Sequence, residues 1–380
     1  MARWPDHYVI ALTGNIGTGK SVVRKMLEHL GAFTIDADAL AHRVIAPGGP
    51  GYNTVTRTFG EWVVGPDGQI NRQRLGRIVF SDPEALAKLE AIIHPYVRQA
   101  VDLLINRSPA RLAVIEAIKI IETGLARECD ALWVVHAPAA LQARRLVEKR
   151  KLSPAEAQQR IAAQNPQTEK LKSADVVIDN SGGFEETWAQ VQAAVTKLGL
   201  AVAAPAPAPT VTATPAGALT VRRARPGDAT TIAALIAQAT NNSKRLQRAD
   251  VIAAFGDKAF MLAEAAGRPA ALAGFKVENL VARVDELYFL TAAPLATAAR
   301  PLLEAVEQSA RELQCEAALV FVTPAQAEAA TAALGPSGYA PATPESLRVD
   351  AWRDAARESM PAGSTLLFKK LREDRVLRPV

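Results

Sequence analysis

The stretch Gly14-Asn15-Ile16-Gly17-Thr18-Gly19-Lys20-Ser21 decides the fold of the first half of this chain. It fits the pattern Gly-x-x-x-x-Gly-Lys-Ser, whose glycines let successive backbone N–H groups turn inward toward phosphate oxygens. Residues 8–13 before it form an apolar run typical of a buried strand, and an apolar stripe at helical spacing follows it: Val22, Val23, Met26, Leu27 and Leu30. The sequence therefore predicts a strand, a loop over residues 14–22 that binds a nucleoside triphosphate, and a helix.

Two side chains of this loop carry specific chemistry. The Lys20 ammonium group is expected to neutralise the β- and γ-phosphates, and the Ser21 hydroxyl is expected to be a ligand of Mg²⁺. Glycine-rich turns between a strand and a helix also occur without a nucleotide. The presence of both flanking elements favours the nucleotide site, with a nucleoside triphosphate and Mg²⁺ as its ligands.

The length and composition indicate two domains. The chain has 380 residues, of which 49% are hydrophobic, enough for two separate cores. Residues 201–218 are rich in alternating Ala and Pro, which cannot continue a helix or a central strand. We predict one domain at residues 1–200, a semi-extended linker at 201–218 and a second domain at 219–375.

Several classes of protein are disfavoured by composition. The sequence contains no stretch with the length and apolarity of a transmembrane helix, and its N-terminus lacks the apolar core of a signal peptide. The net charge is +5, but basic residues are scattered among acidic ones, without a basic run interleaved with aromatics. We therefore expect a cytoplasmic protein that binds small polyphosphates rather than nucleic acid or membrane. Its oligomeric state stays open.

The first half alternates strand-like and helix-like segments. Apolar runs at 33–36, 112–116, 131–137 and 176–179 join residues 8–13, so we predict an α/β domain with a five-stranded parallel sheet. Ligands bind such sheets at the carboxyl ends of the strands, and polar residues follow these strands: Asp36, Asp38, Glu116 and Asn180. One carboxylate of the pair Asp36 and Asp38 could orient an acceptor hydroxyl, or both could cap a helix. The spacing alone leaves these alternatives open.

A helical insertion at about residues 60–106 interrupts this alternation. Its second part, from Glu84 to Arg107, has apolar residues at helical spacing, and Pro95 is expected to kink it or to begin a new helix. His94 and Arg98 are four residues apart and share one edge of the helix. Alone, His94 would be an ordinary core histidine, but the pair is a candidate for binding an anionic substrate.

These motifs together resemble the dephospho-CoA kinase family over residues 8 to about 198. Beyond the phosphate-binding loop, the resemblance rests on motifs in the family's order: Ile35-Asp-Ala-Asp38, His42-Arg43, Asp82-Pro83, Leu89-Glu90-x-x-x-His94-Pro95-x-Val97-Arg98, Glu122-Thr-Gly-Leu125, Gln142-x-x-Arg145, Arg150, Gln164, and Ile178-Asp179-Asn180. Members of this family transfer a phosphoryl group from ATP to the ribose 3′-hydroxyl of dephospho-CoA, giving coenzyme A and ADP in the last step of coenzyme A biosynthesis.

The resemblance also implies roles for individual residues. Asp38 would be the general base, Lys20 and Arg150 would stabilise the transferring phosphoryl group, and Asn180 would contact adenine. Arg150 would lie on a lid that closes over ATP and excludes water. The dephospho-CoA side would be formed by Asp36, Arg43, His94 and Arg98.

The chain departs from the family's usual sequence at two places. Asn15 stands where the family usually has Gly, and Asn tolerates left-handed backbone conformations. Ile118 and Lys119 replace a usual Pro-Leu pair. We expect Lys119 to face the acceptor pocket, binding an acidic group there, or to pair with Glu116 or Glu122. The alternative function is therefore a phosphate-binding-loop kinase for a different small-molecule acceptor.

The second half predicts a mixed α+β domain with the order strand, helix, three strands, helix, strand. It resembles the GNAT acetyltransferase superfamily over residues 219 to about 372, but the turn expected to wrap acyl-CoA pyrophosphate, residues 293–300, has no glycine and contains Pro294. Candidate acid or base residues are only Glu264, Glu286 and Tyr339. This half either binds acetyl-CoA or CoA and acts on it, or is a structural or interaction module, and the missing glycine favours the module.

Overall fold

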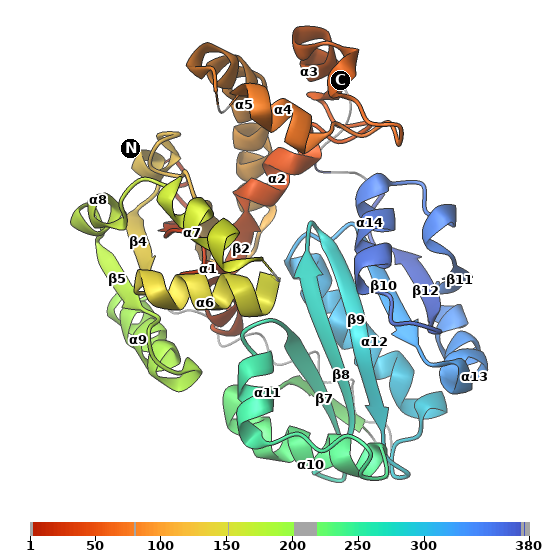
Figure 1. Ribbon diagram of the computed structural model, residues 1–380. Helices are drawn as coiled ribbons and strands as arrows, with labels where there is room; N and C mark the ends of the chain where they lie inside the picture. The colour runs from red at the N-terminus through yellow and green to blue at the C-terminus, as the bar shows by residue number, and fades with distance from the viewer. Residues whose placement is uncertain (1–2, 80, 151, 201–218, 374–375, 377–380) are drawn as a thin grey trace.

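The computed structural model describes residues 3–79, 81–150, 152–200, 219–373 and 376 (Figure 1). The predicted linker at 201–218 lies outside these described residues. Two sheets, each with its own helices, stand side by side in Figure 1, and they correspond to the two halves of the sequence.

The first half contains, in its described residues, a five-stranded sheet with the order β2-β3-β1-β4-β5. The strands are β1 (Tyr8–Thr13), β2 (Phe33–Asp36), β3 (Leu112–Glu116), β4 (Ala131–His136) and β5 (Val176–Asp179). All neighbouring pairs are parallel, with Val9 of β1 opposite Ala113 of β3. This confirms the predicted parallel sheet, whose central strands are apolar because both of their faces are covered.

Helices cover both faces of this sheet. The helices are α1 (Lys20–His29), α2 (Ala37–Val44), α3 (Tyr52–Phe59), α4 (Arg72–Val79), α5 (Pro83–Arg107), α6 (Ala139–Arg150), α7 (Pro154–Ala162), α8 (Gln167–Lys172) and α9 (Phe184–Lys197). On β1, Val9 and Ala11 join the core that contains Val97 and Leu104 of α5. The alternate β1 residues pack instead with α1 and α9. Because the neighbouring strands are all parallel, their carboxyl ends lie at one edge of this sheet.

Helix α5 corrects one expectation. Asp82 caps it by accepting hydrogen bonds from the N–H groups of Glu84 and Ala85, and Pro83 occupies the first turn, where no N–H is needed. The helix then runs without a break through Pro95 to Arg107, so Pro95 does not begin a new helix. Its 25 residues form one continuous support for the insertion.

The second half contains, where it is described, a seven-stranded mixed sheet with the order β11-β12-β10-β9-β8-β7-β6. The strands are β6 (Leu219–Arg223), β7 (Ala259–Ala265), β8 (Arg268–Glu278), β9 (Val281–Phe289), β10 (Ala317–Val322), β11 (Ala340–Ala342) and β12 (Thr365–Lys370). The helices are α10 (Ala229–Ala239), α11 (Arg248–Ala254), α12 (Leu295–Glu312), α13 (Pro324–Leu334) and α14 (Asp350–Ser359). Only β9 and β10 are a parallel pair in this sheet of described strands. The predicted order is found from β6 to β10, except that a second helix, α11, precedes β7, and α13, β11, α14 and β12 follow β10.

The two halves are in direct contact. The His29 ring at the end of α1 lies 3.0 Å from the Phe255 carbonyl oxygen and packs edge-on against the Phe255 ring. Arg43 of α2 pairs with Glu316, which precedes β10. Among the described residues, none of the helices has the length and apolarity needed to cross a bilayer.

Candidate active site

The phosphate-binding loop joins β1 to α1 and needs glycine for steric reasons. Gly19 has a φ of 94° and lies at the N-cap of α1. A Cβ atom there would come within 2.0 Å of Asn180 Nδ2, so a larger residue would displace that side chain. Inside the loop, the Thr18 hydroxyl donates to the Asn15 carbonyl at 2.8 Å. The N–H groups at the start of α1 are therefore held where an anion can approach them.

The side chains of Asn180 and Arg145 both donate hydrogen bonds to the backbone of this loop. Asn180 follows β5, and its Nδ2 donates to the Thr18 carbonyl at 2.7 Å while its Oδ1 accepts from the Thr187 hydroxyl at 3.0 Å. Arg145 of α6 donates to the Thr18 carbonyl at 3.1 Å and to the Asn180 carbonyl at 2.8 Å. Arg145 was part of a sequence motif without an assigned role, and the structure gives it this supporting contact.

The charged side chains at the start of α1 meet Glu116 at the end of β3. Lys20 is buried, with Nζ 3.4 Å from the Asn15 carbonyl oxygen. The Ser21 hydroxyl donates to Glu116 Oε1 at 3.1 Å, and Arg24 Nε donates to Glu116 Oε2 at 2.6 Å. A hydroxyl and a carboxylate oxygen side by side are the hard oxygen donors that Mg²⁺ prefers, so this pair fits a magnesium ion shared with phosphates.

The two aspartates after β2 have different surroundings. Asp36 is the N-cap of α2, and its Oδ1 accepts from the Ala39 N–H at 2.8 Å. Asp38 lies in the first turn of α2, and its Oδ2 accepts from the Ile118 N–H at 3.1 Å. Burial raises the pKa of Asp38, and this effect is opposed by the Ile118 hydrogen bond and by the positive charge of Lys20. The capping role thus falls to Asp36, while the Asp38 carboxylate contacts the backbone of the segment that follows β3.

Two cavities meet at Asp38. One, of about 430 Å³, is lined by Lys20, Ser21 and Asp38 together with residues of the second half. The other, of about 620 Å³, extends over α5 and is lined by Asp38 and by apolar side chains of the insertion. A carboxylate between a phosphate-binding loop and a second cavity is positioned to act on a ligand that reaches from one cavity into the other.

Three of the predicted acceptor residues line the second cavity. His94 has a pKa lowered by burial, and Arg98 donates to the Thr123 carbonyl at 3.0 Å. Lys119 is half exposed and lies 3.6 Å from Glu90 Oε1. The expected position of Lys119 at this cavity agrees with the structure, but its carboxylate neighbour is Glu90. Neither of the partners proposed from the sequence, Glu116 and Glu122, pairs with it in the described residues.

Arg43 is not among these cations. It is buried beside the first cavity, where its guanidinium pairs with Glu316. Arg150, the expected lid residue, is the last residue of α6, and the structure describes its backbone but not its side chain. The predicted roles of Arg43 and Arg150 therefore stay predictions.

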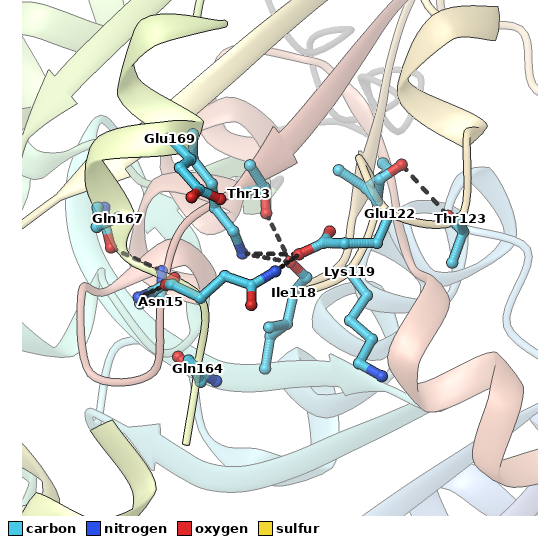
Figure 2. A network of polar contacts seen from close by, with 12 residues as sticks. Thr13, Asn15, Ile118, Lys119, Glu122, Thr123, Gln164, Gln167 and Glu169 are labelled. Atoms are coloured by element: carbon cyan, nitrogen blue, oxygen red, sulfur yellow. Dashed lines mark hydrogen bonds and ion pairs between the residues drawn. The ribbon is translucent and has the colours of Figure 1, made fainter. Parts of the chain in front are cut away.

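A polar network without a local sequence signature surrounds Ile118 (Figure 2). The Ile118 carbonyl accepts from the Thr13 hydroxyl at 3.1 Å and from Lys170 Nζ at 2.7 Å. Burial lowers the pKa of Lys170, and this effect is opposed by Glu122, 4.0 Å away, and by Asp38. Lys170 lies in a short polar helix, α8, where a lysine is unremarkable by pattern. The sequence therefore carried no signal for it.

The loop between α7 and α8, together with the first residue of α8, binds the phosphate-binding loop directly (Figure 2). Gln164 accepts from the Ile16 N–H at 2.7 Å, and Gln167 accepts from the Asn15 N–H at 3.0 Å. The Asn15 side chain donates to the Asn165 carbonyl at 3.0 Å. Asn15 does not adopt a left-handed backbone conformation. Its side-chain amide instead links the phosphate-binding loop to Asn165.

The acid or base candidates of the second half are each held by cations. Glu286 lies 3.0 Å from Lys244 Nζ, and Glu264 lies 3.0 Å from Arg222. The Tyr339 ring is buried with Lys369 Nζ 5.4 Å from its centre. The segment without glycine, residues 293–300, leads into α12, and Pro294 is the N-cap of this helix. Proline has no N–H, so the N-terminus of α12 has one donor fewer.

The first half of the chain is similar to known dephospho-CoA kinases. A family model for dephospho-CoA kinase matches residues 8–186. The dephospho-CoA kinase of Symbiobacterium thermophilum is 46% identical over 189 residues, covering 49% of this chain and 79% of that protein. That of Moorella thermoacetica is 43% identical, covering 50% of this chain and 92% of that protein.

Solved structures resemble each half. TT1252 from Thermus thermophilus has 36% identity and a TM-score of 0.46, and the match covers 50% of this chain and 97% of that one. The PaiA N-acetyltransferase of Thermoplasma acidophilum, solved with coenzyme A, has 11% identity and a TM-score of 0.32. That match covers 40% of this chain and 99% of the other.

Proposed function

This chain belongs to the dephospho-CoA kinase family through its first half. We propose that the site around Asp38 transfers a phosphoryl group from ATP to the ribose 3′-hydroxyl of dephospho-CoA. The observation that supports the assignment most directly is the position of Asp38 between two cavities. One is lined by Lys20 and Ser21, and the other by the cations of α5 and its neighbourhood. ATP and dephospho-CoA would meet there, with their reacting atoms beside this carboxylate.

Asp38 acts as the general base. Its carboxylate accepts the proton of the ribose 3′-hydroxyl as the new oxygen–phosphorus bond forms and the bond from the γ-phosphorus to ADP breaks. Burial makes this carboxylate a better proton acceptor than an exposed one, because its pKa is raised. The hydrogen bond from the Ile118 N–H opposes that rise of the pKa.

The phosphate side is formed by the loop and its neighbours. The N–H groups at the start of α1 and the Lys20 ammonium group bind and neutralise the phosphates. Ser21, with Glu116 beside it, would hold a Mg²⁺ ion that offsets phosphate charge. Arg150 would contribute a further positive charge when its segment closes over ATP, and Asn180 would lie next to adenine.

The acceptor side combines apolar surface with positive charge. Leu86, Leu89 and Val97 line the second cavity, which suits an extended organic chain. His94, Arg98 and Lys119 stand around it and suit the diphosphate of dephospho-CoA. This mixture fits an acceptor that carries both kinds of group.

Turnover of the purified full-length chain tests the proposal. ADP release from ATP should require dephospho-CoA, and Asp38→Asn should reduce kcat by about 10²–10⁴-fold while nucleotide affinity is retained. Near-normal turnover by Asp38→Asn would remove Asp38 from this role. Phosphorylation of nucleoside monophosphates, with dephospho-CoA ignored, would instead favour a kinase with a different acceptor.

For the second half, a structural role is the proposal and binding of acetyl-CoA or CoA is the alternative. The Pro294 cap and the lack of glycine in residues 293–300 support the structural role, because the backbone donors that would hold pyrophosphate are reduced. Calorimetric titration of the full chain with acetyl-CoA separates the two. A second binding site per chain, beyond the acceptor site of the kinase half, would favour the alternative.

A further inference from the structure

An ion pair buried between the two halves lies close to the kinase site. Arg43 Nη2 lies 2.9 and 2.8 Å from the two carboxylate oxygens of Glu316, and its Nη1 donates to the Asn279 carbonyl at 3.2 Å. The two side chains are 7% and 1% exposed. A buried guanidinium with three such contacts is held in one orientation.

Glu316 is itself fixed by the second domain. Its N–H donates to the Leu280 carbonyl at 2.7 Å, and its Oε1 also accepts from the Val376 N–H at 3.1 Å. Its carbonyl accepts from the Leu371 N–H at 2.9 Å, at the end of β12. The carboxylate that holds Arg43 is therefore part of the framework of the second sheet.

Arg43 and Asp38 belong to the same short helix. Helix α2 has eight residues, with Asp38 in its first turn and Arg43 in its last. Five residues of helix correspond to about 7.5 Å along its axis. A rotation or shift of α2 at Arg43 would move the Asp38 carboxylate, because a helix of two turns moves as a unit.

The second domain also reaches the cavity that contains the phosphate-binding loop. The end of β8 and the turn to β9 contribute Glu278, Asn279 and Leu280 to the lining of the cavity that contains Lys20 and Asp38. Asn279 and Leu280 have φ values of 52° and 60°, as a tight two-residue hairpin turn requires. The same turn thus supplies the carbonyl that contacts Arg43 and part of the wall beside Asp38.

We infer that Glu316 is a positioning residue for the kinase reaction, acting on Asp38 through Arg43 and helix α2. This inference rests on the proposed function of Asp38. It gives the second domain a task in phosphoryl transfer that requires neither an acyl group nor a ligand of its own.

The test compares two glutamate variants of the full-length chain. Glu316→Gln removes the charge that faces Arg43, whereas Glu345→Gln makes the same change in an exposed pair with Arg357, 3.4 Å apart in the same domain. For Glu316→Gln, kcat should fall about tenfold or more because the base is displaced, with KM for ATP within about twofold. Glu345→Gln should match the unmodified protein in both constants.

A second comparison asks whether the effect passes through Arg43. In an Arg43→Gln background, adding Glu316→Gln should leave kcat unchanged, because the contact is already lost. If Glu316→Gln is not obtained folded by circular dichroism, Glu316→Asp keeps the charge, withdraws the carboxylate by one methylene group, and should still lower kcat. An unchanged kcat for the folded Glu316 variant, or an equal loss in the Arg43→Gln background, overturns the inference.

The activity of the unmodified chain separates a failure of the proposed function from a failure of the positioning role of Glu316. If it phosphorylates dephospho-CoA and the Glu316 variant does so equally well, only the positioning role fails. If the unmodified chain does not phosphorylate dephospho-CoA, the proposed function and the inference that rests on it are both overturned.

Discussion

Replacing Ile118 with proline should shift the pH dependence of phosphoryl transfer. The Ile118 N–H is 3.1 Å from Asp38 Oδ2, and proline has no N–H to donate. Proline is also the usual residue at this position in the family that the first half resembles, so the backbone of the site is expected to accept it. The substitution therefore removes one hydrogen bond from the general base and leaves the carboxylate itself in place.

The size of the shift follows from the hydrogen bond. A bond to a charged group contributes about 1.5–3 kcal/mol, and the 3.1 Å separation and partial exposure of Asp38 favour the lower end. At 1.36 kcal/mol per pKa unit, the loss corresponds to a rise of about one unit. Burial already raises the pKa of Asp38, so the change adds to that rise. Since the base must be ionised, activity will be lost at a higher pH as the solution is acidified.

The assay is the pH profile of kcat/KM for dephospho-CoA at saturating ATP. In Ile118→Pro, the acidic limb should move about one pH unit upward, with little change on the alkaline side. Ile118→Val keeps the N–H and is the matched control, with an unshifted limb. Ionisation of the two substrates is common to all three proteins and cancels in the comparison. A coincident acidic limb for the proline variant and the control would refute the role of this hydrogen bond.

Three other substitutions test separate parts of the description. Lys119→Leu should raise KM for dephospho-CoA about fivefold, as expected for the loss of about 1 kcal/mol from a half-exposed cation. Lys197→Leu, at an exposed position, is the control and should leave this KM unchanged. Unchanged Michaelis constants for Lys119→Leu would contradict the role of Lys119. Lys170→Met should lower the free energy of unfolding in urea by about 1–3 kcal/mol, since the Ile118 carbonyl loses its charged donor; equal stability would show that this contact is dispensable. His29 has a pKa lowered by burial to about 3, below its unfolded value of about 6.5, so its stabilising effect is lost as pH falls below the unfolded value. From about pH 7.5 to about pH 5.5, His29→Gln should therefore lose about 1.4 kcal/mol less stability than the unmodified chain, and parallel losses in denaturant titrations would exclude this linkage.

Much of the fold could be predicted from local sequence patterns. The strands, the phosphate-binding loop and α5 follow from apolar runs, glycine spacing and helical periodicity, which act over a few residues. The predicted helix from Glu84 begins one residue later than α5 does, because Pro83 occupies the first turn. The continuity of α5 through Pro95 could not be predicted, since packing of the helix against the sheet outweighs the cost of a proline.

The site was predicted less completely because its chemistry depends on long-range contacts. The spacing of Asp36 and Asp38 identifies two carboxylates, but their different roles depend on their partners, the Ala39 N–H for Asp36 and the distant Ile118 N–H for Asp38. Lys170 and Glu316 contact the site across 52 and 273 residues of sequence, respectively, counted from Ile118 and Arg43. Neither contact has a local signature, so no pattern within one segment could have indicated it.

The hydrogen bonds between Gln164, Gln167 and the phosphate-binding loop have a consequence for protein synthesis. They join residues 148 and 152 positions apart, so the loop gains these partners only after the intervening residues have been translated. At about 5–20 residues per second, roughly 8–30 seconds pass between the two events on the ribosome. During that interval the nascent chain has the glycine motif without the contacts that shape it. Nucleotide capture should therefore begin only after the second half of the first domain has left the exit tunnel.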